Sequence, residues 1–177
     1  MIFTLIGMPG CGKSCMGRAI SGKVKMKLID SDKLIEQRTG KKLQAIIDEV
    51  GIEGFRQIEE ETLLSITDDN VIISTGGSAV YSEKAMKYLA SKGKIIYLYC
   101  SYNTIKARLG DFSKRGVVLK PGQTLADLYA ERAPLYSKYA TITIFCDGRA
   151  FPKYQGAVIR AIKRYLPDLN KEKTQGI

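Results

Sequence analysis

The stretch "TLIGMPGCGKSCMG", residues 4–17, joins an apolar run to a glycine-rich turn that ends in a lysine and a serine. The pattern G-x-x-x-x-G-K-[ST], in which each fixed position has a task at a phosphate, is met by Gly7, Gly12, Lys13 and Ser14. The glycines let backbone N–H groups surround an anion, the lysine reaches the β- and γ-phosphates, and the serine hydroxyl ligates Mg²⁺. The stretch therefore predicts a nucleotide-binding loop.

The residues on either side of this loop favour that interpretation over a plain turn with a solvated lysine. Residues 2–6 are typical of a buried strand, and residues 14–21 have the spacing of a helix with one apolar face. A helix that begins at the loop points its positive N-terminal end at the phosphates. Strand, loop and helix in this order are the context that the motif requires.

Strands and helices alternate along the rest of the chain. Apolar, β-rich runs occur at residues 2–6, 27–29, 71–74, 95–100 and 141–146. Apolar faces with helical spacing occur at residues 43–50, 55–66, 85–89, 125–132 and 157–165. The alternation predicts an α/β fold, in which a five-stranded parallel sheet lies between two layers of helices. We expect a single domain over residues 1–170 and a flexible tail at 171–177.

Ligands of such sheets bind beyond the carboxyl ends of the strands, so the residues after each strand are the candidates for a site. Asp30 and Asp32 follow the second strand. Either one acid binds a metal and the other a substrate hydroxyl, or Asp32 caps a helix. Gly76 and Gly77 follow the third strand and permit close approach of a ligand, or form a plain turn. Ser101 follows the fourth strand as a candidate helix cap.

Two further segments carry charge that suits an anionic ligand. Arg56 and Glu59 lie three residues apart on a helix and share a face. They are either part of a ligand site or a surface ion pair. The segment 110–122, "GDFSKRGVVLKPG", lacks helical spacing and contains Arg115 among other basic residues. It is either a lid that closes over a phosphate or a solvated connection.

Composition limits the class of protein. The chain has 177 residues, a formal net charge of +10, four cysteines and no histidine. The basic excess lies at the two ends without interleaved aromatic residues, so we expect no nucleic-acid partner. No apolar run is long enough to span a membrane and no basic leader precedes the first strand, so we expect a cytoplasmic protein. The cysteines lack C-x-x-C spacing and are expected to be reduced thiols, and no apolar face is left over, which favours a monomer.

Together these stretches resemble the shikimate kinases, small phosphate-loop (P-loop) NTPases that are related in fold to nucleoside monophosphate kinases. The resemblance rests on "GMPGCGKS", "IDSD", "FRQIE", "TGG" and "ERAPLY", which occur in the family's order and approximate spacing between Gly7 and Tyr136. It implies phosphorylation of the 3-hydroxyl of shikimate in aromatic amino acid biosynthesis, with ATP as co-substrate, Mg²⁺ as cofactor and a lid at about 110–122.

The resemblance also implies roles for particular residues. The implied nucleotide-binding residues are Gly7, Gly10, Cys11, Gly12, Lys13, Ser14, Cys15, Arg108 and Arg115. Mg²⁺ would be held by Ser14 and, through water, by Asp30. The implied substrate-binding residues are Asp32, Arg56, Gly76, Gly77 and Arg132, with the two arginines on the substrate carboxylate and Glu59 supporting Arg56. The implied catalytic residues are Lys13, Asp32, which aligns or deprotonates the attacking hydroxyl, and Arg115, which arrives with the lid.

Two departures from the family pattern leave other functions open. Ser78 stands where the family usually has a third glycine, and the lid reads "KRGVVL" where the family often has Arg-Pro-Leu. A kinase for another small hydroxylated acid or polyol, such as gluconate, would keep the phosphate loop and use a different acceptor. A non-catalytic nucleotide-binding module would bind ATP without phosphoryl transfer.

Overall fold

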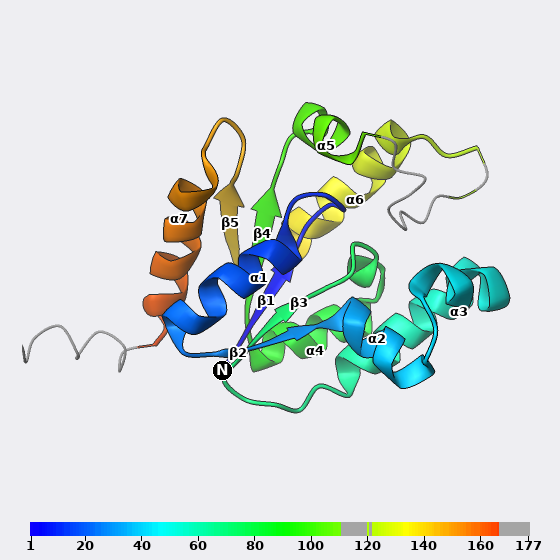
Figure 1. Cartoon of the computed structure of the whole chain (residues 1–177), viewed down its shortest axis with the longest axis horizontal. Helices are drawn as coiled ribbons and strands as arrows, with labels where there is room; N and C mark the ends of the chain where they lie inside the picture. Colours follow the sequence, from blue (N-terminus) through cyan, green and yellow to red (C-terminus); the bar gives the residue numbers. More distant parts are fainter. Residues whose placement is uncertain (111–119, 121, 167–177) are drawn as a thin grey trace, which may run out of the picture.

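The computed structural model describes residues 1–110, 120 and 122–166, which form a sheet between two layers of helices (Figure 1). The strands in these residues are β1 (Ile2–Ile6), β2 (Lys27–Asp30), β3 (Val71–Ser74), β4 (Gly93–Tyr99) and β5 (Ile142–Phe145). They form one five-stranded sheet in the order β2-β3-β1-β4-β5, and all neighbouring pairs are parallel. The predicted fold class is therefore confirmed.

The helices of the described residues connect these strands. They are α1 (Lys13–Ser21), α2 (Ser31–Thr39), α3 (Leu43–Leu64), α4 (Glu83–Lys92), α5 (Tyr102–Leu109), α6 (Leu125–Tyr139) and α7 (Phe151–Lys163), with short 3₁₀ turns η1 (Gly22–Val24) and η2 (Ala79–Tyr81). The two faces predicted at 43–50 and 55–66 belong to α3, which is interrupted at Gly51, where φ is 72° and ψ is 178°. Glycine suits this position because side chains disfavour positive φ.

The helices α2 and α5 had been indicated only by their caps. The Ser101 side chain accepts a hydrogen bond from the Thr104 N–H, so Ser101 caps α5 as predicted. At α2 the capping residue is Asp30, whose side chain accepts from the Lys33 N–H, and Asp32 lies in the first turn. The prediction that Asp32 is the capping acid is therefore wrong, because the chain becomes helical already at Ser31.

The sheet is covered on both faces around its central strand. Every residue of β1 is buried, whereas the edge strand β2 is only partly covered. Helices α1 and α7 pack against each other on one face, and α4 and α6 contact the sheet from the other face (Figure 1). Because all strands run in the same direction, the segments that follow β1, β2 and β3 meet at one edge of the sheet.

Some predictions fall outside the described residues. Arg115, almost all of the lid segment 110–122 and the tail 171–177 are among them. Among the described helices, none combines the length and the apolar character needed to cross a membrane.

Candidate functional site

The loop between β1 and α1 has the form that the sequence predicts for a phosphate site. Gly12 caps α1 with φ of 98° and provides no side-chain hydrogen bond, so the first N–H groups of the helix are left for a ligand. The Nζ of Lys13 donates to the carbonyl oxygens of Gly7, at 2.7 Å, and Met8, at 3.0 Å. The lysine is thus held inside the loop, although its charge has no carboxylate partner among the described residues.

An open cleft of about 350 Å³ lies in front of this loop. Its lining residues are Pro9, Gly10, Gly12, Lys13, Ser14, Cys15, Asp32, Thr75 and Gly77. Two of the predicted nucleotide-binding residues of the loop, Gly7 and Cys11, do not line this cleft. Cys11 is fully buried and its N–H donates to the Met8 carbonyl, so the thiol fills the turn from within.

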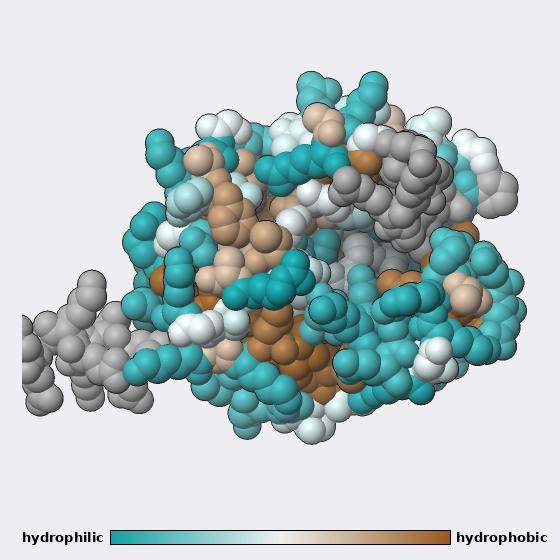
Figure 2. Space-filling view, in the orientation of Figure 1, coloured by the Kyte–Doolittle hydropathy of each residue, from teal (hydrophilic) through white to brown (hydrophobic). Residues whose placement is uncertain are grey.

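The predicted metal ligands lie at the ends of neighbouring strands. The Ser14 hydroxyl lies 3.3 Å from the hydroxyl of Ser74, the last residue of β3, and Asp30 is the register partner of Ser74 on β2. The Asp30 carboxylate caps α2 and lines a groove beside β2, where apolar residues gather in Figure 2. Of the two acids, Asp32 is the one that lines the cleft at the phosphate loop.

Asp32 also reaches the second pocket of the site and connects the two. This pocket is lined by Pro9, Asp32, Leu43, Ile47, Phe55, Glu59, Gly76, Gly77, Ser78 and Arg132. Burial raises the pKa of Asp32 to about 6, against the opposing effect of the Lys13 charge and with smaller contributions from Asp30 and Glu36. The carboxyl group is therefore mostly ionised at neutral pH and can accept a proton from a hydroxyl group in the pocket.

The glycines after β3 let the backbone pass close to these acids. A Cβ atom at Gly76 would collide with the Glu59 carboxylate and lie 2.8 Å from Oδ1 of Asp32. A Cβ atom at Gly77 would lie 3.0 Å from Nη1 of Arg132. Close approach rather than turn geometry therefore explains both glycines, which was one of the two predicted alternatives.

Glu59 makes a contact that the sequence did not predict. Its Oε2 accepts a hydrogen bond of 2.6 Å from the Ser78 hydroxyl, while Oε1 has no partner among the described residues. The side chain is 2% exposed, and burial raises its pKa to about 7, partly offset by the Ser78 hydrogen bond. The expected support of Arg56 by Glu59 is absent from the described contacts, because Arg56 pairs with Glu53 at 2.9 Å.

Arg132 is a buried cation at the wall of this pocket. It is 3% exposed, and no carboxylate of the described residues lies within 4 Å of its guanidinium group. Its Nε donates to the hydroxyl of Tyr81 at 3.2 Å, and the guanidinium of Arg56 lies over the ring of the same tyrosine. A buried charge without an acidic partner is costly, so this group suits an anionic ligand.

The remaining predicted cations differ in their placement. Arg108 lies beside the phosphate loop, where its Nη1 donates to the Cys11 carbonyl at 3.3 Å. Arg115 is outside the described residues. Sequence reasoning missed the roles of Ser74, Ser78 and Tyr81 as contacts of predicted site residues. Their position just after or at the end of β3 was the available signal, since functional residues cluster at such strand ends.

The chain is similar to known proteins over most of its length. The family model for shikimate kinase matches residues 9–163. The shikimate kinase of Haemophilus influenzae is 38% identical over 147 residues, which cover 81% of this chain and 82% of that protein. The shikimate kinase of Vibrio cholerae is 31% identical over 165 residues, covering 92% and 95%. A solved structure, shikimate kinase from Acinetobacter baumannii in complex with shikimate, has a TM-score of 0.81 and 28% identity and covers 94% of this chain and 93% of that one.

Proposed function

The chain belongs to the shikimate kinase family, and from this we propose that it transfers the γ-phosphoryl group of ATP to the 3-hydroxyl of shikimate. The product is shikimate 3-phosphate, an intermediate of aromatic amino acid biosynthesis. The observation that carries the proposal is the buried guanidinium of Arg132, which has no ion-pair partner among the described residues, in a pocket that adjoins the phosphate loop. This arrangement suits a small acceptor with a carboxylate at one end and hydroxyl groups at the other.

Arg132 and Arg56 would bind the carboxylate of the acceptor. The planar guanidinium group can pair with a carboxylate through two parallel hydrogen bonds, which a lysine cannot reproduce. With the carboxylate held there, the hydroxyl groups would point towards Asp32 and the backbone at Gly76 and Gly77. The 3-hydroxyl would then lie between the Asp32 carboxylate and the phosphate loop, because Asp32 lines both pockets.

Asp32 would orient the attacking hydroxyl and accept its proton as the new O–P bond forms and the bond from the γ-phosphorus to the β,γ-bridging oxygen of ATP breaks, with ADP as the leaving group. Phosphoryl transfer needs alignment and charge neutralisation more than covalent help from the protein. Lys13, together with the loop N–H groups of Gly10, Gly12 and Cys15, would hold the phosphates. Arg108 would lie near the base, and Arg115 would neutralise charge on the transferred group from a lid at about 110–122.

Mg²⁺ would be held by the Ser14 hydroxyl and, through water, by Asp30. The donor set fits this ion, which commonly keeps several waters and takes one or two carboxylates in addition to substrate phosphates. The Ser14 hydroxyl lines the cleft at the phosphate loop, whereas the Asp30 carboxylate caps α2 and would act only through a bridging water from the strand next to Ser74. When bound, the ion would neutralise negative charge on the β- and γ-phosphates.

We further propose that the protein is a cytoplasmic monomer of one domain without a nucleic-acid partner. The large apolar side chains exposed among the described residues are Met1, Val50 and Phe145, which belong to three separate segments. A stable obligate interface is usually more continuous and more apolar than this.

The proposal is tested by ADP release from purified protein with ATP and Mg²⁺. The acceptors compared are none, shikimate, gluconate and a panel of polyols, and Lys13→Ala serves as a catalytic control that should be silent in every arm. We expect stimulation by shikimate alone. Turnover confined to another acceptor would assign a different substrate to the same fold, and silence in every arm despite ATP binding would indicate a non-catalytic module.

A further inference from the structure

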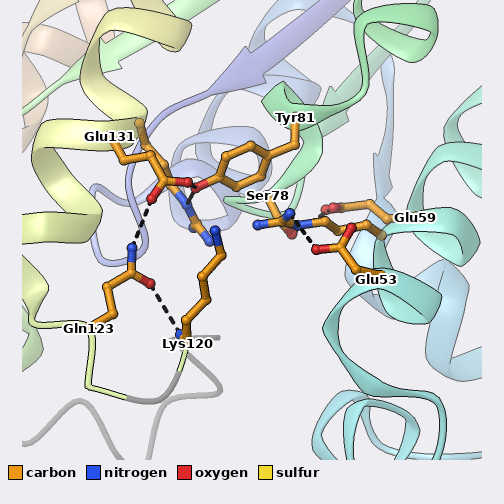
Figure 3. A network of polar contacts seen from close by, with 9 residues as sticks. Glu53, Glu59, Ser78, Tyr81, Lys120, Gln123 and Glu131 are labelled. Atoms are coloured by element: carbon orange, nitrogen blue, oxygen red, sulfur yellow. Dashed lines mark hydrogen bonds and ion pairs between the residues drawn. The ribbon is translucent and has the colours of Figure 1, made fainter.

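Tyr81, in the 3₁₀ turn η2 after the Gly76–Gly77 segment, contacts both predicted carboxylate-binding arginines: Arg132, which lines the second pocket, and Arg56, which lines a neighbouring hollow with Tyr81 itself. Figure 3 shows its ring between Glu131 on one side and the Ser78, Glu59 and Glu53 side chains on the other. None of the sequence motifs included this residue. Its contacts are of two kinds, one made by the ring and one by the hydroxyl group.

The ring of Tyr81 supports Arg56. The guanidinium carbon of Arg56 lies 3.9 Å from the ring centroid, which is a close cation–π contact. The ion pair of Arg56 with Glu53 is a weak restraint, because the Glu53 side chain is 80% exposed. Glu59 and Glu60, the other acids within reach along the helix, accept hydrogen bonds from Ser78 and Ser82 instead. The aromatic face is therefore the main buried support of Arg56.

The hydroxyl of Tyr81 orients Arg132. It accepts from the Nε of Arg132 at 3.2 Å and donates to Oε1 of Glu131 at 2.6 Å. Glu131 is itself held by the side-chain amide of Gln123, which donates to Oε2 at 2.9 Å (Figure 3). The guanidinium carbon of Arg132 also lies 5.2 Å from the ring centroid. One side chain thus fixes the position of two cations that come from different helices.

A neutral side chain that supports an arginine does not compete with an anionic ligand for the guanidinium group. A carboxylate beside Arg56 or Arg132 would compete with the substrate carboxylate for the same guanidinium groups. The phenol ring and its hydroxyl orient the arginines without adding a charge of their own. Arg132 has no acidic partner among the described residues, and the Glu53 partner of Arg56 is exposed and weakly held, so an anion can compete for both guanidinium groups. Restricting two long side chains in advance also removes part of the entropy cost of binding.

We propose that Tyr81 is a positioning residue that presents Arg56 and Arg132 together to the carboxylate of the acceptor. The inference rests on the proposed function for the identity of that carboxylate. Tyr81 acts through the arginines and does not touch the reacting atoms. Its loss therefore affects acceptor binding and leaves the ATP site unchanged.

The kinetic test compares two substitutions at Tyr81 with a matched control. Tyr81→Leu removes ring and hydroxyl, and it should raise KM for shikimate about tenfold, the size expected for a partly desolvated cation–π contact. Tyr81→Phe keeps the ring and should raise KM about threefold through loss of the hydrogen bond to Arg132. KM for ATP should stay within about twofold in both. The control is Tyr88→Leu in α4, which also removes a tyrosine ring near a cation and a buried hydroxyl contact, but away from the pocket.

A second substrate isolates the effect on the carboxylate. In an analogue of shikimate with a hydroxymethyl group in place of the carboxylate, the arginines have no anion to bind. The preference of the enzyme for shikimate over this analogue, as a ratio of kcat/KM, should fall about tenfold in Tyr81→Leu and stay unchanged in Tyr88→Leu. An equal loss with both substrates would show that Tyr81 has only a structural role and would overturn the proposal.

A readout without substrate separates this proposal from the proposed function. A proton above the face of an aromatic ring is shielded, so the Nε–H signal of Arg56 in a ¹H–¹⁵N spectrum should lie upfield and should return to its ordinary position in Tyr81→Leu. Arg56→Lys assigns the signal. An upfield signal in a protein that does not use shikimate would reject the function and keep the support by Tyr81. An unshifted signal in the wild-type protein would reject the support whatever the substrate.

Discussion

Replacing Glu59 by glutamine should make the protein more stable at alkaline pH. Glu59 is 2% exposed, and burial raises its pKa from an ordinary 4.5 to about 7. The folded state therefore binds the proton more tightly than the unfolded state. Stability falls as the pH rises from about 4.5, where the group ionises in the unfolded chain, to about 7, where it ionises in the fold, and is level above that. Glutamine removes the charge and keeps an oxygen that can accept the hydrogen bond from Ser78.

The magnitude follows from the difference between the two pKa values. Each pKa unit corresponds to about 1.4 kcal/mol, so the buried carboxylate costs about 3 kcal/mol at pH 8 and about 1 kcal/mol at pH 5. Glu59→Gln should therefore raise the free energy of unfolding by up to about 3 kcal/mol at pH 8, and this advantage should shrink by about 2 kcal/mol at pH 5. The neighbouring charge of Asp32 is one of the causes that raise the pKa of Glu59, so part of the measured difference reflects the coupling of these two acids.

Urea unfolding at the two pH values measures this difference. The matched control is Glu61→Gln on the same helix, whose side chain is exposed and should leave stability within about 0.5 kcal/mol at either pH. A Glu59→Gln protein that is less stable than wild type at pH 8 would refute the reasoning. It would mean that the positive charge of Arg132 outweighs burial and keeps Glu59 ionised in the fold.

Three further substitutions test the division of roles in the site. The ratio kcat/KM with shikimate should rise as the pH increases through about 6, where Asp32 ionises, and Asp32→Asn should lower transfer at least about 100-fold while calorimetry shows unchanged ATP affinity. A loss of ATP affinity would instead assign Asp32 to the phosphate site. Arg132→Lys should raise KM for shikimate and lower kcat without a change in melting temperature, because the planar fork is lost and the charge is kept; near wild-type kinetics would remove Arg132 from the site. Gly76→Ala should abolish shikimate-dependent turnover and spare ATP binding, since the added Cβ meets the Glu59 carboxylate; normal turnover would contradict the close approach described here.

The parts of the fold that the sequence predicted are those set by local patterns. The buried strand β1 and the loop up to Ser14 follow from an apolar run and a fixed motif, and both agree with the structure. One predicted alternative placed the cap of α2 at Asp32, two residues after the capping residue Asp30. Either of two acids two residues apart can cap a helix. Which of them does so depends on where strand β2 ends, and this is set by the pairing of Asp30 with Ser74 on β3 rather than by the local sequence.

The partner of Arg56 shows a different limit. Glu53 lies three residues before it on the same helix, and Glu59 and Glu60 lie three and four residues after it, so spacing alone allows any of the three acids. Ser78, which follows strand β3, donates a short hydrogen bond to Glu59, so this acid is bonded to Ser78 and not to Arg56. Such a contact joins residues 19 positions apart in the chain, and no helical or strand periodicity encodes it.

Ser78 and Tyr81 therefore act together in determining which groups support Arg56 and Arg132. Ser78 draws Glu59 away from Arg56, which would leave that arginine with only an exposed acid as support. Tyr81, three residues later, supplies an aromatic face at the same guanidinium group and a hydroxyl at Arg132. Because neither contact adds negative charge next to the arginines, the serine that departs from the family pattern is compatible with binding of an acidic acceptor.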